Sequence, residues 1–155
     1  MSTTIHASCV AVGGKAVLLL GKSGAGKSDL ALRLIDDGGK LVADDACELF
    51  LRGGKLYARA PASIAGMIEI RGLGIVALPH VKNACVSLVV ELEASAARLP
   101  ERAFYTPPAG LKPKAPVPLI RVKAEGASAP ARIRAALAAF SQGRFRDTFN
   151  PKSRP

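Results

Sequence analysis

Residues 21–28 read Gly-Lys-Ser-Gly-Ala-Gly-Lys-Ser and match the pattern G-x-x-x-x-G-K-[ST] at each fixed position. Glycines in such a loop let backbone N–H groups surround a phosphate, and the helix that follows points its positive end at the same anion. Lys27 would reach the β- and γ-phosphates, and the Ser28 hydroxyl would bind magnesium. The loop follows an apolar stretch and precedes an amphipathic one, as this mechanism requires. The predicted nucleotide site comprises Gly21, Lys22, Ser23, Gly24, Ala25, Gly26, Lys27 and Ser28.

Two adjacent aspartates, Asp44 and Asp45, follow a second apolar stretch. In phosphate-loop proteins an acidic residue at a strand end holds magnesium directly or through water. Two acids suggest two roles, one beside the metal and one able to accept a proton from a nucleophile. A solvated turn is the alternative, because aspartate favours turns. The sequence contains no guanine-reading N-K-x-D motif, which argues against an ordinary GTPase.

Residues 68–76, Ile-Glu-Ile-Arg-Gly-Leu-Gly-Ile-Val, place two charges inside an apolar run. In a strand, Ile68 and Ile70 would share one face, and Glu69 and Arg71 would share the other. This pattern alone fits either an ordinary surface ion pair or a site that holds a charged ligand.

The elements that must position these groups can be read from turn residues and apolar spacing. Gly13 and Gly14 separate two apolar stretches, which predicts a hairpin that ends at the phosphate loop. Apolar residues at helical spacing predict a helix after Ser28 that stops at Gly38-Gly39. Ser128 is expected to cap a second helix with Pro130 in its first turn. Further strands are expected at 40–44, 47–59 (a hairpin around Gly53-Gly54), 68–78, 84–93 and 117–123, with an extended proline-rich connector over 100–118.

Composition sets wider bounds. With 155 residues, 49% of them apolar, the chain suits one compact domain with a real core. Its longest apolar stretches are too short to cross a bilayer, and no secretory leader is visible, so a cytoplasmic location is expected. Cys9, Cys47 and Cys85 lack metal-site spacing and are expected to be reduced thiols.

The net charge of +10, concentrated after Arg121, indicates an anionic partner. Nucleic acid is not expected as that partner, because aromatic residues are few and no nucleic-acid module is recognisable.

Three stretches together, 21–32, 41–49 and 68–76, resemble the catalytic domain of HPr kinase/phosphorylase. Members of that bacterial family phosphorylate a serine on the small phosphocarrier protein HPr or its relatives. The resemblance implies a strand-rich α/β single domain that contains a P-loop and has the HPr kinase/PEP carboxykinase-like fold. The catalytic domain would span 1–143, and the basic tail 144–155 is expected to be frayed.

The resemblance also implies roles for individual residues. Asp45 would be the catalytic acid/base, His6 the catalytic histidine, and Arg98 the later catalytic arginine, with Arg102 as its competitor. Lys27 would act on the phosphates, and Ser28 and Glu69 would be magnesium ligands beside Asp44. Arg71 would meet phosphate or fix the Glu69 carboxylate, and the two glycines after it would let the backbone approach the substrate. The substrate region would consist of Ile68, Glu69, Ile70, Arg71, Gly72, Leu73 and Gly74.

The function implied is an ATP- and Mg²⁺-dependent serine kinase acting on an HPr-like phosphocarrier, hexameric as in the family and without a membrane partner. Longer family members carry an additional N-terminal domain, whereas this chain starts at the catalytic part, like the short alphaproteobacterial forms. The family's late P-G-R-N segment, associated with dephosphorylation, is replaced by residues 117–134, so the phosphorylase direction stays open. The alternatives are a small-molecule P-loop kinase and a non-catalytic ATP-binding regulatory module. The presence of both Asp45 and Glu69 argues against the second.

Overall fold

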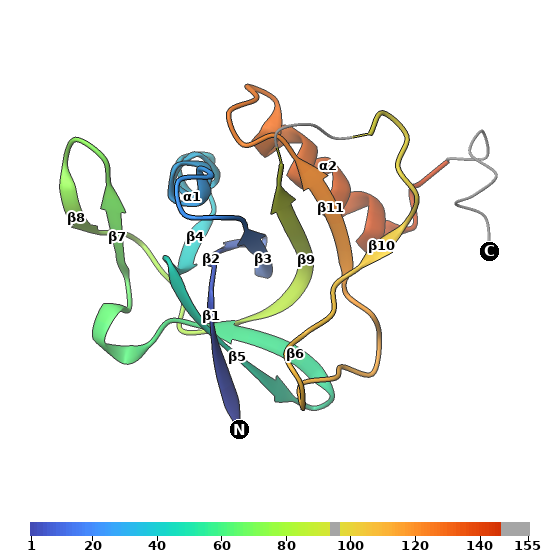
Figure 1. Ribbon diagram of the computed structural model, residues 1–155, viewed down its shortest axis with the longest axis horizontal. Coiled ribbons are helices and arrows are strands. Elements are labelled where there is room, and N and C mark those ends of the chain that lie inside the picture. The colour runs from blue at the N-terminus through green and yellow to red at the C-terminus, as the bar shows by residue number, and fades with distance from the viewer. Residues whose placement is uncertain (94–96, 147–155) are drawn as a thin grey trace.

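The computed structural model describes residues 1–93 and 97–146 and is rich in strands (Figure 1). Its two helices are α1 (Lys27–Asp36) and α2 (Ala129–Gln142), and a short 3₁₀ turn, η1, spans Ala62–Ile64. Neither helix of the described part of the chain is long and apolar enough to cross a membrane. The strands are β1 (Ser2–His6), β2 (Ser8–Val12), β3 (Lys15–Leu20), β4 (Lys40–Ala43), β5 (Ala46–Arg52), β6 (Lys55–Arg59), β7 (Met67–Ile70), β8 (Gly74–Ala77), β9 (Ala84–Leu92), β10 (Ala103–Phe104) and β11 (Pro118–Val122).

The main sheet has nine strands. Seven of its strands are neighbours in the order β1-β5-β6-β9-β3-β2-β4. On one edge of β9, β6 pairs with the start of the strand and β11 pairs with its end, and β10 pairs with β11. The long strand β9 runs parallel to both β3 and β11, whereas the remaining pairs are antiparallel. The predicted hairpins β2–β3 and β5–β6 are confirmed, and each reverses at a glycine pair with positive φ. These connections bring the end of β3, which leads into the phosphate loop, beside the end of β9.

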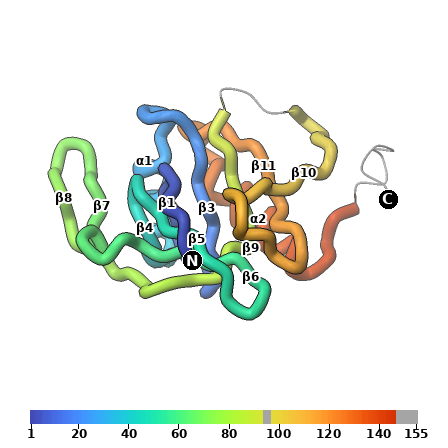
Figure 2. Tube along the Cα trace, turned by 60° about the horizontal axis from the view of Figure 1, so that its bottom comes forward, coloured from blue at the N-terminus to red at the C-terminus, as the bar shows by residue number. Residues whose placement is uncertain are grey.

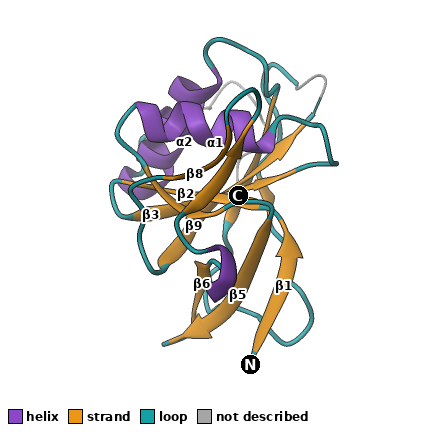
Figure 3. Ribbon diagram, turned by 90° about the vertical axis from the view of Figure 1, so that its left-hand side faces the viewer, coloured by secondary structure: helices purple, strands orange, loops and turns teal. Residues whose placement is uncertain are grey.

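Side chains of β3 alternate between two apolar layers, as expected of a strand buried on both faces. Ala16 and Leu18 belong to one cluster with residues of β5 and β6, and Val17 and Leu19 belong to a second cluster with residues of α1 and α2. Figure 3 shows both helices on one side of β2, β3 and β9, with β1, β5 and β6 on the other. The strand that leads into the phosphate loop is therefore packed against apolar residues on both of its faces.

The expectation of a single strand over 68–78 is wrong, because this stretch forms a hairpin. Strands β7 and β8 pair antiparallel as a separate two-stranded sheet, with Glu69 opposite Ile75. Gly72 has a φ of +87° and Gly74 a φ of +112°, values that favour glycine. These glycines therefore let the chain reverse, and Arg71 lies in the turn instead of sharing a strand face with Glu69.

Three smaller predictions also differ from the structure or lie partly outside it. The proline-rich connector is not wholly irregular, because its residues Ala103–Phe104 form β10. Ser128 does occupy the N-cap position of α2, but its hydroxyl accepts a hydrogen bond from Arg132 Nε instead of from a backbone N–H. Of the expected tail 144–155, residues 147–155 lie outside the described residues.

Candidate active site

A cavity of about 500 Å³ opens between the phosphate loop, the first half of α1 and the β7–β8 hairpin. It unites the three stretches that the sequence singled out, although they are far apart along the chain. Its lining consists of Ser23, Gly24, Gly26, Lys27, Ser28, Asp29, Leu32, Asp45, Glu69, Ile70 and Arg71.

The phosphate loop is folded around the ammonium group of Lys27. The Lys27 side chain is buried, and its Nζ donates to the carbonyl oxygens of Gly21 at 2.6 Å and Lys22 at 3.0 Å. Lysine has three N–H donors, so one remains for a ligand oxygen. Gly26 has a φ of +100° directly before α1, and a Cβ there would lie 3.1 Å from the Cβ of Ala124. Glycine at this position therefore serves both the backbone conformation and the close packing of the loop.

Asp44 is a buried carboxylate that accepts hydrogen bonds from three separate elements. Its Oδ1 accepts from the hydroxyls of Ser28 at 2.7 Å and Ser8 at 3.0 Å, and its Oδ2 accepts from the backbone N–H of Glu69 at 3.2 Å. Buried polar groups need such partners because an unsatisfied one is costly. Asp44 therefore orients the Ser28 hydroxyl and ties β7 to the base of the phosphate loop.

Asp45 is exposed, in contrast to its neighbour. Its side chain is 71% accessible, and its Oδ1 lies 3.3 Å from His6 Nδ1. Asp45 is also the one non-glycine residue of the described chain with positive φ, at +68°, a conformation that aspartate tolerates better than most residues. The Asp45 N–H donates to Ser8 Oγ at 3.3 Å, and His6 Nε2 lies 3.4 Å from Ser23 Oγ. The imidazole thus bridges Asp45 and the phosphate loop.

The residues predicted to bind magnesium fit a hard cation. Ser28 offers a hydroxyl oxygen whose proton is directed to Asp44, and Glu69 offers an exposed carboxylate on the opposite wall of the cavity. Within residues 1–93 and 97–146, no three His, Cys, Asp or Glu side chains gather as a metal cluster. Magnesium usually needs only one or two carboxylates, because waters and substrate phosphates complete its shell. This donor set is therefore suited to a metal shared with a nucleotide.

Other predicted residues take different places. Ile70 and Arg71 line the cavity, whereas Ile68 is buried in the cluster that includes residues of α1. Arg98 is exposed and is not among the residues that line the cavity. The Arg102 guanidinium lies 3.9 Å from the centre of the Phe145 ring and also does not line the cavity. The structure therefore does not bring either arginine to the phosphate loop, and the catalytic role of Arg98 stays a prediction.

Sequence reasoning missed Ser8. This fully buried hydroxyl donates to Asp44 Oδ1 and accepts from the Asp45 N–H, so it touches both aspartates. The available signal was a hydroxyl residue opening an otherwise apolar stretch two positions after His6.

The neighbouring Cys9 is also buried, and burial together with nearby Cys47 raises the pKa of the Cys9 thiol well above its usual value. A neutral thiol at Cys9 is not a nucleophile.

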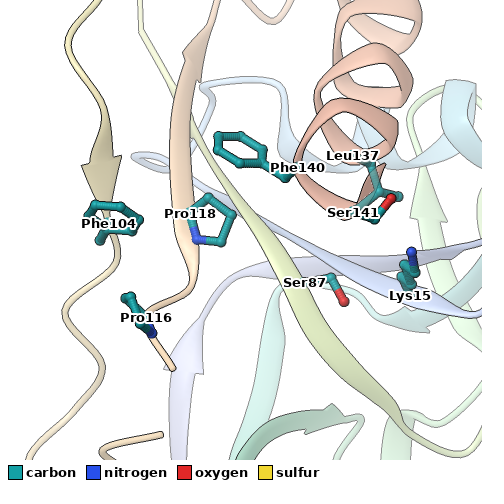
Figure 4. Close-up of a pocket in the computed structure, with 8 residues that line it drawn as sticks. All are labelled: Lys15, Ser87, Phe104, Pro116, Pro118, Leu137, Phe140 and Ser141. Carbon is teal, nitrogen blue, oxygen red and sulfur yellow. The ribbon is translucent and has the colours of Figure 1, made fainter. Parts of the chain in front are cut away.

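A second cavity, of about 310 Å³, lies between the end of α2 and strands β10 and β11 (Figure 4). Its lining is mainly apolar and includes no carboxylate, so it lacks the groups that phosphate chemistry needs. The lining residues are Lys15, Ser87, Phe104, Pro116, Pro118, Leu137, Phe140 and Ser141. The cavity at the phosphate loop is therefore the candidate active site.

A glycine loop with a buried lysine, a following helix and a strand-end acid pair define a phosphate-loop domain. The family model described as the HPr serine kinase C-terminal domain matches residues 1–101 of the 155. The chain belongs to this family, as the resemblance of its three stretches predicted.

Individual relatives agree with this assignment. The HPr kinase/phosphorylase of Brevibacillus brevis is 43% identical over 102 residues, which cover 59% of this chain and 32% of the relative. That of Clostridium tetani is 47% identical over 77 residues, which cover 50% of this chain and 25% of the relative. The chain thus spans about a third or less of the length of these curated relatives.

A solved structure supports the fold over nearly the whole chain. The Hpr(Ser) kinase/phosphatase from Coxiella burnetii matches with a TM-score of 0.77 and 26% sequence identity. The match covers 91% of this chain and 92% of that one. The predicted fold class, a strand-rich α/β domain of the HPr kinase type, is confirmed.

Proposed function

We propose that this domain is an ATP- and Mg²⁺-dependent kinase that phosphorylates a serine of an HPr-like phosphocarrier protein. The observation that carries the proposal is the pairing of two groups in one cavity. A phosphate loop lies on one wall, and the exposed Asp45 carboxylate, held by His6, faces the same space. A nucleotide-binding module without chemistry would need the loop but not this aspartate. The names of the relatives support the choice of acceptor.

The phosphate loop would bind and orient the nucleotide. Backbone N–H groups from Gly24 to Lys27 and the start of α1 would surround the phosphates, and Lys27 would neutralise charge on them. Ser28 and Glu69 would hold a magnesium ion, which when bound supplies further neutralisation of phosphate charge. Asp44 would keep the Ser28 hydroxyl pointing its lone pairs towards the metal.

Asp45 would act on the acceptor. As the serine oxygen attacks the γ-phosphorus and ADP leaves, the Asp45 carboxylate would accept the hydroxyl proton. His6 would orient that carboxylate through its Nδ1 contact. Asp44 is unsuited to this task, because it is buried and both of its oxygens already accept hydrogen bonds from the protein. The difference in burial between Asp44 and Asp45 therefore supports the assignment of the proton-accepting role to Asp45.

Several further properties stay predictions. The resemblance implies a hexameric assembly and a catalytic role for Arg98, and the sequence itself predicts a cytoplasmic location and a domain boundary at residue 143. The phosphorylase direction stays open.

Mass spectrometry of purified bacterial HPr-like proteins, incubated with this chain, ATP and Mg²⁺, tests the proposal. We expect one added phosphate on a serine, which disappears when Mg²⁺ is chelated. A parallel panel of small metabolites tests the small-molecule kinase. Phosphate transfer to a metabolite and to none of the proteins would contradict the proposed function, as would nucleotide binding with no transfer at all.

A further inference from the structure

The β7–β8 hairpin stands at one side of the domain, separate from the main sheet (Figures 1 and 2). It is anchored through β7, whose Ile68 is buried in the cluster that includes residues of α1. Strand β8 pairs with β7 alone among the described strands, and most of its residues are exposed. The hairpin thus lines the cavity through the end of β7 and Arg71, and its second strand, β8, is open to solvent.

The open part of the hairpin carries large apolar side chains. Leu73 is 75% exposed and Ile75 is 71% exposed, and they stand two residues apart. Single exposed apolar residues are common on protein surfaces and need no explanation. Two of the six large apolar side chains exposed in the described part of the chain thus lie on this one small hairpin, and clustered exposed apolar residues are typical of a contact surface.

The strand register places Ile75 beside the candidate active site, and Leu73 lies in the turn that begins at Arg71. Ile75 lies directly opposite Glu69 in the antiparallel pair, so their side chains are neighbours on the same face of the hairpin. Arg71, at the start of the turn, lines the cavity. No hydrogen bond or ion pair joins the Arg71 side chain to another residue of the described ranges. We call Arg71, Leu73 and Ile75 the hairpin rim; it combines apolar surface with an available positive charge.

We propose that the hairpin rim is the docking surface for the acceptor protein, an inference that rests on the proposed function. A nucleotide is held by the phosphate loop, and a small metabolite would have no use for apolar surface outside the cavity. A protein acceptor needs such surface to bring its serine to Asp45. A second copy of this chain seated on the rim would cover the mouth that the acceptor must enter. The acceptor is therefore expected to carry an apolar patch beside its serine and a carboxylate for Arg71.

The test combines Leu73→Ser with Ile75→Thr, because threonine keeps the strand preference of β8. Steady-state phosphorylation of the HPr-like protein should show KM for that protein raised by about 10- to 100-fold, the size expected when central apolar contacts of an interface are truncated. ATP affinity, measured by direct titration, should stay unchanged. Phe104→Ser is the matched control, because Phe104 is 54% exposed but belongs to β10 and lines the other cavity. That control should leave KM for the protein unchanged.

The outcomes separate this inference from the proposed function. If the wild-type chain phosphorylates no HPr-like protein, the proposed function fails and this inference fails with it. If the wild type is active and the double variant keeps its KM, the docking surface alone is wrong. Sedimentation of the wild-type chain and of the double variant tests whether a second copy of the chain occupies the rim instead. A wild-type oligomer that dissociates in the double variant would make the rim a contact between copies and would overturn the inference.

Discussion

The two walls of the candidate active site are held in opposite ways. On the wall of the phosphate loop, Ser8, Lys27 and Asp44 are buried, and their polar atoms bond to the protein itself. On the wall of the hairpin, the side chains of Glu69 and Arg71 are exposed. The buried wall can stabilise charge without reorganising, because its groups are already fixed. The exposed wall is left for groups that must meet a metal, a nucleotide and an acceptor. Variants on each wall can therefore test this division.

Lys27→Ala should have the largest effect on phosphate transfer, because it removes the charged group of the buried wall. We expect phosphate transfer to fall by on the order of 10³-fold or more, because a charge-neutralising group is lost at the phosphates. Circular dichroism should show an intact fold. Lys40→Ala is the matched control, because Lys40 is an exposed lysine at the start of β4 that does not line the cavity. Near-normal transfer by the Lys27 variant would contradict the assignment of the loop.

Asp45→Asn should separate binding from chemistry. An amide keeps the shape of the side chain but cannot accept the serine proton, so single-turnover transfer should slow by roughly 10²- to 10⁴-fold. ATP affinity should remain close to the wild-type value. Asp44→Asn should instead change the dependence of transfer on Mg²⁺, because Asp44 orients Ser28. Should the chemical step depend on Asp44 and be indifferent to Asp45, the two roles are exchanged.

Glu69→Gln tests the exposed wall. A neutral amide is a poorer ligand for a hard dication, so Mg²⁺-dependent nucleotide binding should weaken. The loss should reach at least the roughly 10- to 100-fold typical of groups that only support a metal ligand. Titration of Mg²⁺ at fixed ATP measures it, with Glu48→Gln as the control, since Glu48 pairs with Arg59 and does not line the cavity. Unchanged affinities would show that Glu69 is an ordinary surface carboxylate.

Ser8→Ala should give the smallest of these effects on transfer and a measurable loss of stability. The change removes a donor to Asp44 and leaves the Asp45 N–H without its acceptor, which should lower the free energy of unfolding by about 1–3 kcal/mol. Transfer should fall by about 10-fold, because both aspartates lose a positioning partner. Ser8→Thr retains the hydroxyl and should recover most of both.

The control for Ser8 is Ser87→Ala on β9, whose hydroxyl donates to the Cys85 carbonyl oxygen outside the site. Chemical denaturation and single-turnover transfer should leave this variant near wild type. A Ser8→Ala protein that loses stability but transfers phosphate at the wild-type rate would reduce Ser8 to a structural role.

Local signals predicted much of the fold. The hairpins at Gly13-Gly14 and Gly53-Gly54 were predictable because turn geometry depends on a few neighbouring residues. The same reasoning failed for 68–78, where the apolar run hid a reversal at Gly72 and Gly74. Apolar periodicity fits one long strand and two short strands equally well. Only the two glycines indicated that the chain reverses between two short strands.

The chemistry of the phosphate loop was determined by the sequence itself. Gly21 to Ser28 are contiguous, so the N–H groups, the lysine and the hydroxyl expected to meet phosphate and metal all come from one short segment. The tertiary structure alone decided the division of labour between Asp44 and Asp45. Two adjacent identical residues are equivalent by local pattern, and they differ because of what packs on each. Asp44 meets Ser8, 36 residues away, and the backbone of Glu69, 25 residues away, whereas Asp45 turns outwards to His6. Burial and partners of this kind exist only after β1, β2, α1 and β7 have assembled, because each supplies at least one contact from a different part of the chain.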